Sequence, residues 1–130
     1  MGKIDRGFAM HATKISYEYR SAGGYGMQGN AVLAGEITPE EKEIILQKLE
    51  NGEVFIPSQV GLSDLQEIYF EEHGFSWDDD EDHVWHILKS IQLTDEKPTE
   101  SMDVHELVRR FKEVEWDVTE VLRRLSPDIY

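Results

Sequence analysis

The chain has 130 residues, with 13 basic and 27 acidic side chains and a formal net charge of −14. This length suits a single domain over residues 1–130 with a substantial buried core. The acidic balance disfavours direct binding of nucleic acid or of an anionic membrane. The absence of cysteine excludes disulfides and thiolate chemistry and is typical of a reducing compartment. Because no apolar run is long enough for a signal peptide or a membrane span, we expect a soluble cytoplasmic protein.

The negative charge is concentrated in one third of the chain. Residues 49–88 contain no Lys or Arg, and their carboxylates alone carry −11. Like charges at this density repel one another, and they attract basic surfaces and cations. The eleven carboxylates belong to Glu50, Glu53, Asp64, Glu67, Glu71, Glu72, Asp78, Asp79, Asp80, Glu81 and Asp82.

The first third of the chain predicts a β-hairpin. Residues 1–12 show no periodicity, and we expect either a loose N-terminal arm or an added first strand there. Residues 13–20 alternate apolar and polar side chains, as a half-buried strand does. A glycine-rich connection over residues 21–29 leads to a second predicted strand over residues 30–37, which we expect to pair with the first.

A helix is predicted after this hairpin. Thr38 can cap it, Pro39 suits the first helical position, and Glu41 completes a Thr-x-x-Glu capping box. Asn51-Gly52 is predicted to end the helix in a left-handed C-cap.

The middle of the chain predicts short elements around an acidic loop. Residues 54–56 read as a short strand, and Ser63 is predicted to cap a second helix that ends at Gly74. Residues 77–82 form the acidic loop, and residues 84–93 alternate again as a strand.

The alternation over residues 84–93 also predicts which side chains face the core. We expect Trp85 and Ile87 on the sheet face that bears Tyr17 and Tyr19, with the helices packed against them.

The last third predicts two helices. Asp103 with Glu106 opens the first, Trp116-Asp117 interrupts it, and a short helix is predicted over residues 118–125. Strands this few cannot build a sandwich. The element order therefore predicts an α+β fold, a small mostly antiparallel sheet with three to four helices packed on one face.

A glycine motif offers one candidate ligand site. Gly24, Gly26 and Gly29 match G-x-G-x-x-G, whose backbone N–H groups can approach a nucleotide's phosphates. Residues 30–35, directly after the motif, read as a strand rather than the helix that a dinucleotide site requires. The motif therefore predicts either a nucleotide-binding loop or a flexible hairpin connection.

The acidic loop resembles a calcium loop only at its start. Asp78, Asp80 and Asp82 give D-x-D-x-D, but His83 and Lys89 stand where an EF-hand needs Gly and Glu. His83 and His86 point to opposite sides of the predicted strand. We predict no metal site and no cofactor.

Aromatic residues flank the acidic loop, as in a binding patch with aromatic anchors and charged surroundings. No catalytic motif occurs, so we expect a non-enzymatic module that binds a basic protein surface. The predicted partner-binding residues are Glu67, Glu71, Glu72, Trp77, Asp78, Asp79, Asp80, Glu81 and Asp82.

The sequence leaves a sharper form of this function and two alternatives to it open. In the sharper form, the carboxylates mimic nucleic-acid phosphates and inhibit a DNA- or RNA-processing protein, as small acidic phage and plasmid proteins do; this analogy rests on composition. An alternative is a small nucleotide- or metal-dependent enzyme that uses the Gly24–Gly29 loop. A second alternative is a structural domain whose acidity serves solubility alone.

Overall fold

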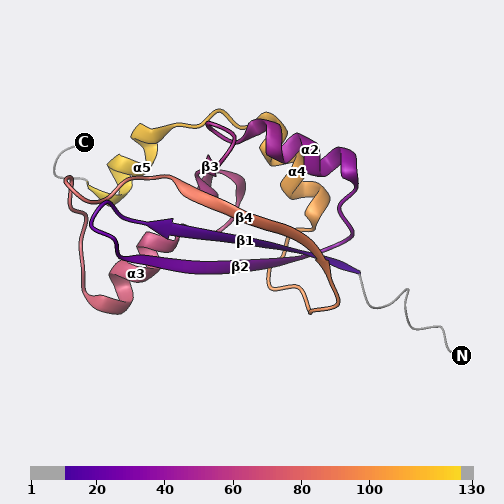
Figure 1. Cartoon of the computed structure of the whole chain (residues 1–130), viewed down its shortest axis with the longest axis horizontal. Helices are drawn as coiled ribbons and strands as arrows, with labels where there is room; N and C mark the ends of the chain where they lie inside the picture. The colour runs from indigo at the N-terminus through magenta and orange to yellow at the C-terminus, as the bar shows by residue number, and fades with distance from the viewer. Residues whose placement is uncertain (1–10, 127–130) are drawn as a thin grey trace, which may run out of the picture.

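The computed structural model describes residues 11–126, which form an α+β fold with a curled four-stranded antiparallel sheet (Figure 1). The predicted arm over residues 1–12 lies outside the described residues except at its end, where Ala12 already belongs to the first strand. The strands are β1 (Ala12–Arg20), β2 (Gly26–Ala34), β3 (Val54–Phe55) and β4 (His86–Thr94). The helices are α2 (Pro39–Lys48), the 3-10 helix η2 (Pro57–Val60), α3 (Leu65–His73), α4 (Val104–Glu113) and α5 (Val118–Leu125).

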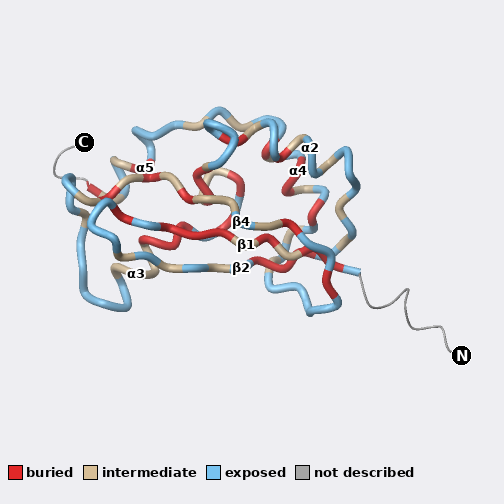
Figure 2. The backbone as a smooth tube through the Cα atoms, in the orientation of Figure 1, coloured by how far each residue is buried: buried red, intermediate tan, exposed pale blue. Residues whose placement is uncertain are grey.

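The sheet order is β2-β1-β4-β3, so the first strand lies in the interior of the sheet. Ile15, Tyr17 and Tyr19 of β1 are buried on one face, as the alternation predicts. Helices α2, α3 and α4 pack on that face and complete the main core. Figure 2 shows the buried backbone along β1 and the exposed backbone of the loop between α3 and β4.

The caps of the helices obey local sequence rules. Thr38 and Glu41 form the predicted capping box at α2, and Asp103 accepts the backbone N–H of Glu106 at α4. Helix α2 ends at Lys48, however. The left-handed Asn51 and Gly52 form a separate turn before β3, so their predicted C-cap is wrong.

The start of α3 also differs from its prediction. Its N-cap is Asp64 rather than Ser63, whose carbonyl instead accepts the Tyr17 hydroxyl at 2.8 Å. Gly74 ends the helix in the left-handed conformation, as predicted. None of the described helices has the length and apolar character needed to cross a bilayer.

A β-bulge changes which side of β4 faces the core. Ser16 lies opposite Ser90, but Tyr17 lies opposite Leu88, so Lys89 is the extra residue. Beyond the bulge Ile87 lies opposite Glu18, on the face away from Tyr17. The prediction that Ile87 and Trp85 share the face of Tyr17 and Tyr19 is therefore wrong, because one extra residue exchanges the two faces.

Trp85 belongs to a second, smaller core. It packs with Trp116 against Ile56, Val84 and Val121, beside α5. The two indole rings meet edge to face, with centroids 6.4 Å apart.

The glycine motif lies mostly in a strand. Gly26 and Gly29 belong to β2 and pair with Arg20 and Tyr17, while Gly24 lies in the turn with φ +95°. The predicted long connection over residues 21–29 is therefore wrong after Tyr25, because pairing with β1 outweighs the weak strand propensity of glycine.

Close packing explains one of these glycines. A Cβ at position 29 would lie 2.7 Å from Cδ2 of Leu65, a buried residue of α3. The absence of a side chain thus lets α3 approach the sheet.

We predict that Gly29→Ala lowers the free energy of unfolding by about 1–3 kcal/mol, because the added methyl group overpacks the contact with Leu65. Urea denaturation measures this change. The control is Gln28→Ala at the neighbouring position, expected within about 0.5 kcal/mol of the parent. Equal stability of the parent and Gly29→Ala would contradict the packing role.

Candidate partner-binding site

The carboxylates of residues 49–88 do not form one continuous surface. Glu50 and Glu53 lie in the turn between α2 and β3, above the sheet in Figure 1, whereas α3 and its following loop lie at the lower left. Asp64 and Asp82 are buried. The carboxylates that cluster along the sequence therefore fall into three groups in the structure. Asp64 and Asp82 are buried, Glu50 and Glu53 lie in the turn before β3, and the others lie on α3 and its following loop.

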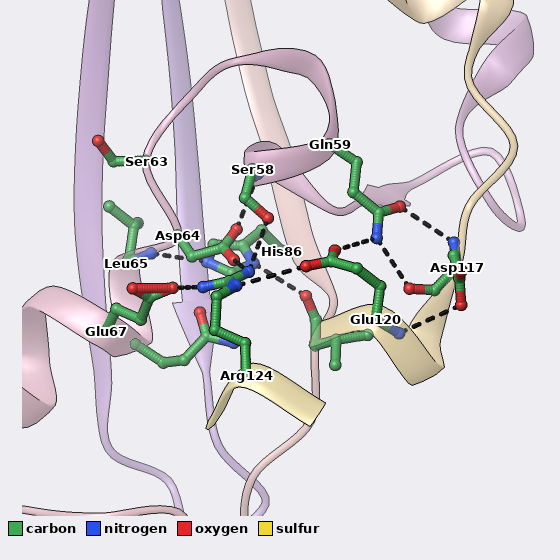
Figure 3. A network of polar contacts seen from close by, with 12 residues as sticks. Ser58, Gln59, Ser63, Asp64, Leu65, Glu67, His86, Asp117, Glu120 and Arg124 are labelled. Carbon is green, nitrogen blue, oxygen red and sulfur yellow. Dashed lines mark hydrogen bonds and ion pairs between the residues drawn. The ribbon is translucent and has the colours of Figure 1, made fainter. Parts of the chain in front are cut away.

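Arg124 of α5, which is partly exposed, neutralises part of this charge within the molecule (Figure 3). Its guanidinium lies 3.2 Å from Oδ2 of Asp64 and 3.4 Å from Oε2 of Glu120, and it forms an ion pair with Glu67. The same group donates to Oγ of Ser58 at 3.1 Å. Glu67, a predicted partner-binding residue, thus lies in a partly exposed network of ion pairs and hydrogen bonds that joins η2, α3 and α5.

Gln59 extends this network to the start of α5. Its side-chain amide donates to the Asp117 carbonyl and to Oε1 of Glu120, each at 2.8 Å, and accepts the Asp117 backbone N–H at 3.0 Å. These bonds hold α5 against η2. The carboxylates that Arg124 and Gln59 contact, those of Asp64, Glu67 and Glu120, therefore stabilise the fold.

His86 is a fully buried neutral imidazole beside the network. Its Nε2 accepts the Leu65 backbone N–H at 2.9 Å, and its Nδ1 lies 3.3 Å from the Val84 carbonyl. A backbone N–H can only donate, so the proton resides on Nδ1. Burial lowers the pKa of His86 to about 4, against the opposing effect of the Asp64 charge.

Asp82 anchors the acidic loop from within. Tyr19 donates to Oδ1 at 2.6 Å, Tyr25 donates to the same oxygen, and the Asp78 backbone N–H donates to Oδ2 at 2.9 Å. Burial and these bonds to Asp82 raise the pKa of both tyrosines, which therefore stay protonated. The structure places Asp82, a predicted contact residue, beneath the surface as an anchor.

The remaining predicted carboxylates are at the surface. Glu71 and Glu72 are exposed on α3, and Asp78, Asp79 and Asp80 are exposed in the loop. Within residues 11–126, no Lys or Arg side chain forms an ion pair with any of these five. Their charge is available to a partner.

A stack of aromatic rings adjoins these carboxylates. Ring centroids of Tyr25 and Tyr69 lie 4.7 Å apart, those of Tyr69 and His73 4.2 Å, and those of His73 and Phe75 5.8 Å. Phe75 is 52% exposed. Of these rings, only Phe75 is indicated by its place beside the acidic loop in the sequence. The i, i+4 spacing of Tyr69 and His73 was a signal, but Tyr25 reaches them only through the fold.

We call these exposed and partly exposed residues together the acidic-aromatic surface. A hollow of about 260 Å³ opens in it, and the described residues line it with aromatic rings and carboxylates and with no cationic side chain. Tyr25 and Phe75 supply the rings, and Asp78, Glu81 and Asp82 supply the carboxylates. The surface comprises Tyr25, Tyr69, Glu71, Glu72, His73, Phe75, Asp78, Asp79, Asp80 and Glu81.

Trp77 lies at the border of this surface. Its indole N–H donates to Oδ1 of Asp79 at 2.5 Å, while its ring packs on the second core. Trp77 therefore covers the core and orders the loop. Among the described residues, no group of three or more His, Asp or Glu side chains is arranged to hold a metal ion.

Comparisons of the chain with protein-family models, with curated proteins and with solved structures find no significant match.

The Arg124 network generates a stability prediction. Arg124→Ala leaves the Asp64 carboxylate buried without its cation, so we expect the free energy of unfolding to fall by about 2 kcal/mol in urea denaturation. Arg123→Ala is the matched control, because Arg123 is exposed, and we expect a change within about 0.5 kcal/mol. Equal losses in the two variants would show that the network does not hold α5.

His86 generates a pH prediction. The group titrates near 6.5 when unfolded and about 4 when folded, so between these values only the unfolded chain binds the proton. The free energy of unfolding should therefore fall as the pH drops from 6.5 to 4, with His86 contributing up to about 3 kcal/mol. In His86→Gln this contribution is absent, and urea titrations at several pH values should show a shallower decline. Parallel declines for both proteins would be inconsistent with a buried neutral imidazole.

Proposed function

We propose that the protein is a non-enzymatic interaction module whose acidic-aromatic surface binds basic side chains of a partner protein. The observation that supports this proposal is the hollow beside Tyr25 and Phe75. Aromatic rings and carboxylates line it, and among the described residues no Lys or Arg side chain lines it. Aromatic faces attract cations through the ring quadrupole, and carboxylates attract them by charge.

Arginine fits this hollow better than lysine does. Its planar guanidinium can stack on an aromatic ring while donating two parallel bonds to a carboxylate, whereas an ammonium group acts as a point charge. Phe75 and Tyr25 offer the rings, and Asp78 and Glu81 offer carboxylates. We therefore infer that the partner presents arginine side chains on a basic surface.

The nucleic-acid-mimic version is a special case of this proposal. In it, the partner's basic residues are those that otherwise contact phosphates. Duplex DNA would then compete with this protein for the partner. Nucleotide binding through the glycine motif stays an alternative, although Gly26 and Gly29 lie in β2. A thermal-shift assay with nucleotides and Mg²⁺ tests that alternative directly.

The test compares two variants that remove the same charge. One carries Glu72→Gln, Asp78→Asn, Asp79→Asn and Asp80→Asn on the acidic-aromatic surface. The control carries four Glu→Gln changes elsewhere, at residues 36, 40, 43 and 53. Asp82 is left intact because its loss would disturb the fold.

We expect the surface variant to bind a labelled arginine-rich peptide about tenfold more weakly than the parent in fluorescence anisotropy, and the control variant about twofold more weakly. Binding by the parent should weaken as salt is raised, because the attraction is electrostatic. Phe75→Ala should reduce binding of the arginine-rich peptide more than that of a lysine-rich one. Equal weakening in the two charge variants would instead support acidity that serves solubility alone.

A further inference from the structure

The open edge of β4 is a second surface with a binding geometry. Strand β3 pairs only with His86 and Ile87 of β4, and Glu53 accepts the N–H of Leu88. From Lys89 to Thr94, no described strand lies beside β4 on this side.

Strand alternation shows which backbone groups this edge exposes. Val32 of β2 bonds to Thr99 on the side away from β1, so its partner Lys14 points toward β4 and Gln92. The residues on either side of Gln92, Ile91 and Leu93, therefore direct their N–H and C=O groups outward. No backbone group among residues 11–126 pairs with them there.

Natural edge strands are usually protected by charge, proline or a covering loop. The loop at Thr99 covers the outer edge of β2 at Val32 in this way. Residues 90–94 of β4, Ser-Ile-Gln-Leu-Thr, contain neither charge nor proline. An extended segment can add to such an edge through main-chain hydrogen bonds.

An apolar groove runs along the same edge, between β4 and α2. It consists of two adjoining hollows of about 480 and 360 Å³ that share Lys42 and Ile91. Leu46 of α2 and Leu93 of β4 line it and are 38% and 41% exposed, so both side chains offer apolar surface to a ligand in the groove. A strand added to β4 would direct every second side chain into this groove.

The charges of the groove indicate what such a segment carries. In the part of the chain that the structure describes, its charged lining residues are Lys42 and Lys89, and no carboxylate lines either hollow. Lys42 forms no ion pair within residues 11–126, and Lys89 lies 3.5 Å from Glu18, which also pairs with Arg20. In a chain of net charge −14, this groove is locally basic.

We propose that the β4 edge and its groove bind an extended segment of a partner protein with alternating apolar residues and a carboxylate that meets Lys42. A second copy of this chain fits less well, because two molecules of −14 repel each other over their whole surfaces. A short segment with one carboxylate interacts mainly with Lys42 and Lys89, because salt screens the more distant negative charges of the chain. This site is separate from the acidic-aromatic surface and does not depend on the function proposed for it.

The experiment selects peptides of about eight residues from a random phage-displayed library against the full chain, a length that matches a typical strand. We expect enrichment of peptides that alternate apolar residues and carry an Asp or Glu. Methylating alternate backbone nitrogens of a selected peptide should weaken its binding at least tenfold, because strand addition requires those N–H groups.

Protein variants place the peptide on the edge. Leu93→Glu and Lys42→Glu should each weaken binding by about fivefold or more. Gln28→Glu is the control, because Gln28 is exposed on β2 at the opposite edge of the sheet, and it should weaken binding about twofold at most. Thermal melting confirms that each variant folds.

Three results would overturn the proposal. The first is a selection without enrichment, and the second is peptide binding that Leu93→Glu and Lys42→Glu leave unchanged. The third is a dimer in sedimentation velocity that Leu93→Glu dissociates, because the occupant of the edge would then be a second copy.

Discussion

The bulge at Lys89 determines which side chains of β4 face the main core on each side of it. On one side of it Ile91 faces the main core, and on the other side His86 does. Only this exchange of faces lets the His86 ring reach the Leu65 N–H and hold the first turn of α3. The position of α3 in turn decides where the acidic loop lies. A single extra residue in one strand thus supports both the buried hydrogen bond between His86 and Leu65 and the surface beside it.

The carboxylates of residues 49–88 differ in their electrostatic environment, because some have partners within the molecule and others are exposed to solvent. One guanidinium, that of Arg124, serves Asp64, Glu67 and Glu120, and tyrosine hydroxyls solvate Asp82 in place of water. A buried carboxylate requires such partners, because removal from water is costly. The surface carboxylates are solvated by water and need no internal partner, but they repel one another. That repulsion favours any partner that brings positive charge.

The features that local sequence could predict are those that local physics decides. The capping box at Thr38, the cap at Asp103 and the left-handed end at Gly74 all depend on residues within one turn. The fold class is predictable from element order and alternation, and it is confirmed by the sheet and its helices. Edge and interior positions, by contrast, depend on pairing between residues far apart in the chain, as between Ala12 and Thr94.

The parts of the site that sequence could not predict depend on distant contacts. Nothing near Asp64 announces a partner in Arg124, sixty residues away. Likewise, Tyr25 joins Tyr69 only because the β1–β2 turn folds beside α3. Charge counted along the chain overstates the surface charge, because burial and pairing are properties of the fold.

The placement of the tryptophans gives the molecule two separate optical reporters. Trp77, Trp85 and Trp116 all contact the smaller core, whereas Tyr17 and Tyr25 belong to the sheet and its turn. Trp116 also touches Phe111 of the main core and so forms the seam between the two. Indole emission therefore follows chiefly the smaller core and the docking of α5, whereas phenol absorbance follows the sheet, its turn and Tyr69 of α3. Separation of the two signals on heating would mean that one end of the protein opens while the other stays closed.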